Sequence, residues 1–131
     1  MLFLSDVRDW LKSFGVGEHY YIGKLDNKND KSIGVYQRKS VSPPITAIGQ
    51  PSSYEIKPIS ILIHWTKNAN ETEKAAYKLY KKIKDISLLT INNTRIYMLK
   101  LLQSEPIDVG TDDNGVYERV IEFDLYYERT D

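Results

Sequence analysis

The stretch DVGTDDNGVYERVIEFDLYYERTD, residues 108–131, joins a turn signal to a strongly alternating pattern. After Gly115, apolar and acidic side chains largely alternate along the sequence. The apolar set is Tyr117, Ile121, Phe123, Leu125 and Tyr127, and the acidic set is Glu118, Glu122, Asp124 and Glu128. Successive side chains of a strand point to opposite faces of its sheet. The pattern therefore predicts an antiparallel strand with one face on a core and one face in water.

The segment TDDNG, residues 111–115, resembles at first sight an oxygen-rich calcium loop. If Gly115 takes the sixth position of such a loop, Gly110 takes the first and Ile121 the twelfth, where the site needs an acid and a bidentate Glu. We therefore predict no metal site. Asn and Gly tolerate the positive φ that hairpin connections need, and Asp side chains accept from nearby backbone donors. The segment is predicted to be a hairpin tip.

The periodicity of the preceding segments predicts the remaining helices and strands. An apolar stripe after Ser5 predicts a short helix that ends before Gly15. Asn70, with Glu73 three residues later, predicts the start of a second amphipathic helix over 70–86. The predicted strands are 19–25 and 32–38, joined as a hairpin, then 59–66, 94–103 and a short one before the Asn92-Asn93 turn.

A proline-bearing segment separates the second and third strands. Residues 38–58 hold four of the five prolines of the chain, and each proline removes a backbone donor. A loop of this length inside a compact domain points to function or to contact with another chain. We predict an arm over about 39–58 that contacts a neighbouring subunit, with Pro43, Pro44 and Tyr54 as interface residues.

These elements predict an α+β fold. Two main helices pack on one side of a mostly antiparallel sheet, and the long proline-containing loop leaves it. The length of 131 residues predicts a single domain over 1–131.

Composition and motifs exclude several classes of function. Lys plus Arg equals Asp plus Glu at 18 each, so no global field attracts nucleic acid or an anionic membrane. The chain has no cysteine, which excludes thiolate chemistry. Its start, MLFLSDVRDW, lacks a basic region before its short apolar run, so we expect no signal peptide and no membrane span. His19 and His64 fall on strands without a catalytic spacing, and we predict no enzyme, no cofactor and no catalytic residue.

Two features leave alternatives open. The lysines of the 70–86 helix form either a solvated face or the phosphate-binding face of a small nucleic-acid-binding module. The tyrosine pairs at 20–21 and 126–127 place one ring on each sheet face, which fits either half-covered structural residues or a protein interface. A third alternative is a small enzyme, which would need a pocket that joins His64 to carboxylates.

The order of these segments resembles a known family. The sharpest part is a spaced pattern of Pro106, Gly110, Asp113 and Gly115 followed by the alternating strand, and the second is IGKL, residues 22–25, with its polar turn. Together they resemble the minor capsid or tail-terminator proteins of long-tailed bacteriophages and prophages. Glu122 departs from this resemblance, since many members of the family carry a small or amide residue at that position.

The resemblance implies a structural protein rather than a catalyst. It implies a homo-oligomer, typically a hexameric ring, that caps the tail tube and joins it to the head-side connector. Such a subunit is made in the host cytoplasm and is then incorporated into the virion at the head–tail interface, where DNA passes through the ring. We expect Asp112, Asp113 and Asn114 to meet a neighbouring protein at the rim. The acidic edge of Glu118, Glu122, Asp124 and Glu128 is expected to face the channel or a subunit contact beside it, because carboxylates repel phosphates.

Overall fold

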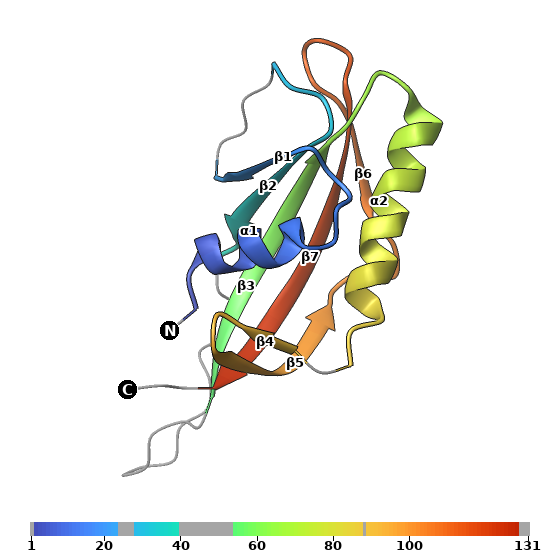
Figure 1. Cartoon of the computed structure of the whole chain (residues 1–131). Coiled ribbons are helices and arrows are strands. Elements are labelled where there is room, and N and C mark those ends of the chain that lie inside the picture. The colour runs from blue at the N-terminus through green and yellow to red at the C-terminus, as the bar shows by residue number, and fades with distance from the viewer. Residues whose placement is uncertain (1, 24–27, 40–53, 88, 129–131) are drawn as a thin grey trace.

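The computed structural model describes residues 2–23, 28–39, 54–87 and 89–128. The elements in chain order are α1 (Leu4–Lys12), β1 (His19–Ile22), β2 (Ser32–Gln37), β3 (Tyr54–His64), α2 (Ala69–Lys84), β4 (Leu89–Ile91), β5 (Thr94–Leu101), β6 (Ile107–Thr111) and β7 (Tyr117–Glu128). They form the predicted α+β fold, with a mostly antiparallel sheet (Figure 1).

The alternating strand β7 lies in the middle of this sheet. β3 pairs with it in antiparallel direction along one side, and β5 and β6 share its other side. Across the described residues the strand order is β1-β2-β3-β7-β5-β4, with β6 paired to β7. The predicted hairpin tip TDDNG therefore does connect two adjacent strands, β6 and β7.

The first two strands correct the sequence prediction, because they are not a hairpin. β1 and β2 pair in parallel, with His19 opposite Ser32 and Ile22 opposite Val35. Residues 23–31 join them and can span roughly 30 Å when extended, whereas β1 is only about 13 Å long. The chain thus has enough length to return to the level of His19 before β2 begins. The backbone N–H groups of Glu18 and His19 both donate to the carbonyl of Lys31, at 2.8 and 3.3 Å.

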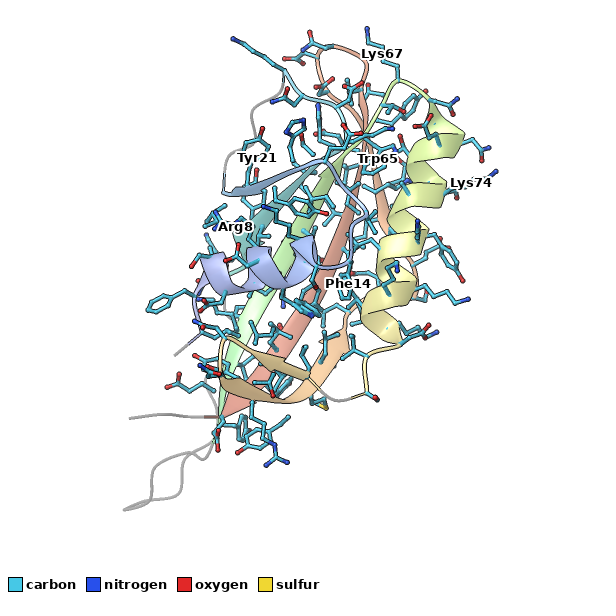
Figure 2. The ribbon with its side chains drawn as sticks, viewed as in Figure 1. Arg8, Phe14, Tyr21, Trp65, Lys67 and Lys74 are labelled. Atoms are coloured by element: carbon cyan, nitrogen blue, oxygen red, sulfur yellow. The ribbon has the colours of Figure 1, made fainter. Side chains whose placement is uncertain are left out.

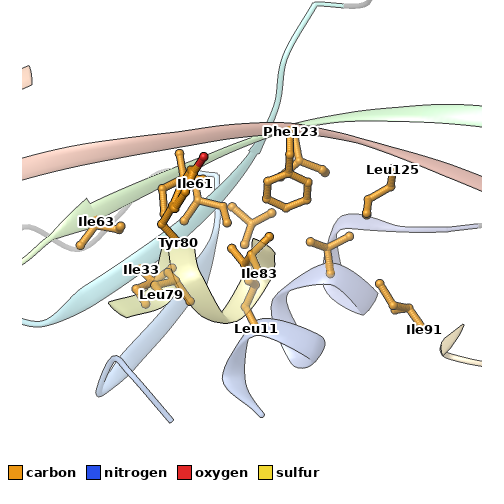
Figure 3. Close-up of a cluster of buried hydrophobic side chains, with 14 of the residues drawn as sticks. Leu11, Ile33, Ile61, Ile63, Leu79, Tyr80, Ile83, Ile91, Phe123 and Leu125 are labelled. Atoms are coloured by element: carbon orange, nitrogen blue, oxygen red, sulfur yellow. The ribbon is translucent and has the colours of Figure 1, made fainter. Parts of the chain in front are cut away.

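The core lies between one face of the sheet and both helices. The apolar residues Ile121, Phe123, Leu125 and Tyr127 of β7 are buried, as the alternation predicts. Figure 3 shows Leu11 of α1 and Ile83 of α2 on the same side of the sheet as Phe123. The opposite face of the sheet, called here the outer face, therefore carries the acidic set.

Both helices begin earlier than the sequence predicts. In α1 the carboxylate of Asp6 accepts from the backbone N–H of Phe3 at 2.9 Å, so Phe3, and not Ser5, precedes the first turn. In α2 the cap is Asn68 rather than Asn70, and its side chain accepts from the N–H of Glu71 at 3.0 Å. Neither helix in the described part of the chain is long and apolar enough to cross a membrane.

The C-terminal boundary predicted for the arm is wrong, because β3 begins at Tyr54. Residues 54–58, including Pro58, pair with β7, and the carbonyl of Pro58 accepts from the N–H of Arg38. Pro43 and Pro44 lie outside the described residues.

Candidate functional site

The acidic set on the outer face of β7 is held by polar partners from other parts of the chain. The guanidinium of Arg38 pairs with the carboxylate of Asp124 and also donates to the carbonyl of Ile59. The amide of Gln103 donates to Glu122 at 2.9 Å. The side chains of Arg38 and Asp124 are 16% and 18% exposed, so this pair is largely shielded from water. The acidic edge is thus partly neutralised.

Glu118, the first acid of the set, contacts a buried histidine. Its Oε2 atom lies 3.0 Å from Nδ1 of His64, because β3 and β7 pair with these two residues directly opposite each other. Asp112 Oδ2 lies 3.7 Å from the same nitrogen. Strand register brings together three titratable groups that no sequence spacing had linked.

The arrangement around His64 does not resemble a catalytic pocket. The imidazole is fully buried, and its Nε2 atom has no hydrogen-bond partner among the described residues. A general base must reach a substrate proton, which a ring with no solvent-accessible surface cannot do in this conformation. The cluster therefore fastens the end of β3 to the β6–β7 hairpin.

The tip of that hairpin is organised by Asp112. Its Oδ1 atom accepts from the N–H groups of Asn114 and Val116, both at 2.9 Å, as in an Asx turn. Burial raises the pKa of the Asp112 carboxyl, but these N–H groups, nearby His64 and the N–H of Gly115 outweigh burial and hold the pKa below its ordinary value of 3.8. Asp113 and Asn114 are exposed at the tip. The turn leaves them available for contact.

The expected interface residues that the structure describes lie at two ends of the subunit. Tyr54 pairs with Glu128 at one end of β3, and His64, beside Asp112, ends the same strand. Ten residue steps separate Tyr54 from His64, which is roughly 33 Å. Tyr54 and the 112–114 tip therefore cannot belong to one contact patch on a single subunit.

An aromatic hollow marks the Tyr54 end of the outer face. It measures about 590 Å³ and is lined by Tyr54, Tyr97, Met98 and Tyr126. The rings of Tyr54 and Tyr126 lie 5.9 Å apart, and the guanidinium of Arg95 lies 5.1 Å from the ring of Tyr97. The sequence predicted Tyr54 at an interface and left Tyr126 open between a structural and an interface role, but it did not indicate Tyr97 or Met98. A bulge between Ile96 and Met98 changes the faces to which the side chains of Tyr97 and Met98 point. An alternating sequence pattern does not reveal such a bulge.

The lysines of α2 project away from the sheet. Lys74, labelled in Figure 2, lies on the exposed side of the helix, and so do Lys78, Lys81 and Lys82. Tyr77 is 54% exposed among them and stacks on Tyr80, with 6.5 Å between ring centres. These lysines are exposed, which fits both the solvated face and the nucleic-acid-binding face that the sequence leaves open.

The chain matches a known protein family. A family model described as "Bacteriophage tail terminator protein" matches residues 9–129. That range runs from α1 to just beyond β7 and includes the outer face, the hairpin tip and the aromatic hollow. A search of curated proteins finds no match to the chain.

Proposed function

Because the chain belongs to the bacteriophage tail terminator family, we propose that six copies close into a ring at the head-side end of the tail tube. This ring stops the tube and joins it to the head-completion or connector protein. The protein is synthesised in the host cytoplasm, becomes part of the virion at the head–tail interface and catalyses no reaction. The family membership is the observation that carries the proposal.

The shape of the subunit supports a role between two different partners. The aromatic hollow and the exposed Asp113-Asn114 tip lie at opposite ends of the long β3–β7 pair. A subunit with two separated contact regions can meet another subunit at one end and a different protein of the head–tail interface at the other. We place Asp113 and Asn114 at one rim of the ring.

The outer face of β7 suits the side of the subunit nearest the channel. Its carboxylates are negatively charged, so they repel the phosphates of DNA, whereas a basic surface would hold them. Arg38 and Gln103 moderate this charge by pairing with Asp124 and Glu122. We therefore place the acidic edge at the channel or at the subunit contact beside it, where DNA can slide past.

The test is assembly on tail tubes, followed by electron microscopy and light scattering. The chain is expected to cap tubes as a closed ring, and a deletion of Ser42–Ser53 is expected to prevent ring closure. The deleted residues lie outside every described helix and strand, so circular dichroism and urea unfolding of the variant provide the control for folding. Rings that form equally well after the deletion would remove the arm from the proposal. Wild-type chains that never form a ring on tubes would contradict the proposed function itself.

A further inference from the structure

The free edge of β5 exposes large apolar side chains. β4 pairs only with Thr94–Ile96, so among the described residues Tyr97–Leu101 has no strand on the side away from β7. Tyr97 and Met98 are 46% and 48% exposed, and Leu102 is exposed just beyond. Natural proteins protect such edges with charges or prolines, and here the edge carries one charged residue, Lys100.

Hollows lie on both faces of this edge. On the outer face is the aromatic hollow of about 590 Å³. On the helix-bearing face is a second hollow of about 170 Å³ between α2 and β5, lined by residues that include Ile83, Leu89 and Leu99 and also by Lys84 and Ser87. Tyr97 and Met98 line both hollows.

A bulge explains why residues of this one strand edge line both hollows. Ile96 lies opposite Tyr127 and Met98 lies opposite Tyr126, so Tyr97 is an extra residue in the ladder. Bulges re-aim side chains and interrupt pairing. An extended segment added along this edge would gain backbone hydrogen bonds and would send alternate side chains to opposite faces. Each face offers a hollow to receive them.

We propose that this edge, Tyr97–Leu101, is the docking site for a strand contributed by residues 45–48 of a second copy of the chain. Those residues read Ile-Thr-Ala-Ile, a β-prone run between Pro44 and Gly49. In a strand, Ile45 and Ala47 point to one face and Thr46 and Ile48 to the other, so each hollow receives one isoleucine. The proposal rests on the proposed ring and identifies the surface that receives its arm.

Strand spacing favours a second copy over the same chain. The lateral order is β2-β3-β7-β5, so the free side of β5 lies four strand spacings, about 19 Å, from β2. Six residue steps separate Lys39, just after β2, from Ile45, and they span only about 20 Å at full extension. To reach the β5 edge of its own chain, the segment from Lys39 to Ile45 would have to be almost fully extended and cross the sheet in a straight line. A neighbouring copy has no such limit.

Disulfide trapping tests the proposal in the full-length chain, which has no cysteine of its own. Single variants Thr46→Cys and Ala47→Cys are each mixed with Lys100→Cys under mild oxidation. Two adjacent positions are used because side chains of neighbouring residues alternate between faces. The matched control receptor is Lys78→Cys, an exposed lysine on α2. Mixed dimers on a non-reducing gel should exceed those of the control at least about tenfold, because docking raises the effective thiol concentration.

Each alternative result has a defined meaning. Ring formation without preferential linkage to Lys100→Cys overturns the proposed docking site and leaves the proposed function standing. An intramolecular bond in a dilute Ala47→Cys/Lys100→Cys double variant, without mixed dimers, shows docking within one chain and also overturns the proposal. If the wild-type chain forms no ring on tail tubes, both the docking site and the proposed function fail.

Discussion

The carboxylates along β7 differ in how the fold holds them. Glu118 contacts the buried imidazole of His64 at 3.0 Å, and its side chain is 17% exposed. Glu128, at the far end of the strand, lies opposite Tyr54 and remains half-buried. An alternating sequence makes these two residues equivalent. The structure makes Glu118 part of the framework.

Replacing Glu118 by Lys is therefore expected to destabilise the fold. The variant places a cation beside a buried imidazole and removes its hydrogen-bond partner, which should lower the free energy of unfolding by about 2–4 kcal/mol. Urea unfolding monitored by tryptophan fluorescence measures this change. Glu128→Lys is the matched control, with an expected change within about 0.5 kcal/mol. Equal losses in both variants would show that the His64 contact contributes nothing particular.

Asp112 gives stability a defined pH dependence. Its folded-state pKa lies below its ordinary value of 3.8, so the ionised form is favoured in the folded chain. The resulting stabilisation is complete above pH 3.8 and is lost as the pH falls through the lower, folded-state pKa. Asp112→Asn should be less stable than wild type at neutral pH, and the difference should shrink towards the acid end. Urea titrations at several pH values, with Asp113→Asn as control, measure it. A constant difference across pH would contradict this assignment.

The helices show how packing selects among possible caps. Asn68 and Asn70 are both suitable N-cap residues, and Glu73 favours Asn70 by local rules. In the structure the hydroxyl of Thr72 donates to the carbonyl of Asn68 at 2.9 Å, and Thr72 is buried. Starting at Asn68 rather than Asn70 therefore lengthens the helix by two residues and places Thr72 against the core.

The two asparagines give a matched pair of variants for α2. Asn68→Ala removes an acceptor for the N–H of Glu71 and should lower stability by about 1 kcal/mol. Asn70→Ala replaces an exposed residue of the first turn and should change stability little or raise it slightly. Thermal unfolding by circular dichroism distinguishes the two. A larger loss for Asn70→Ala would restore the sequence-based cap.

At the scale of the whole molecule, β3 and β7 form the axis on which the other elements are placed. Both helices cover one face, and the opposite face carries the acidic edge and the aromatic hollow. The hairpin tip and the free edge of β5 lie towards different ends of this axis (Figure 1). The proposed arm exchange would use one end for contact between subunits, and the tip would remain available for a different protein.

The sequence by itself determined the elements with strong periodicity. The two-residue alternation of β7, the 3.6-residue stripes of both helices and the Asn-Gly turn signals are local, because each depends on neighbouring side chains facing the same or opposite ways. They predicted the α+β class and the hairpin tip before β7, but not the short strand β6. Tertiary structure decided what depends on pairing between distant segments. The parallel β1–β2 pair, the contacts of His64 with Glu118 and of Arg38 with Asp124, and the bulge at Tyr97 all follow from strand register, since a shift of one residue exchanges the faces of a strand.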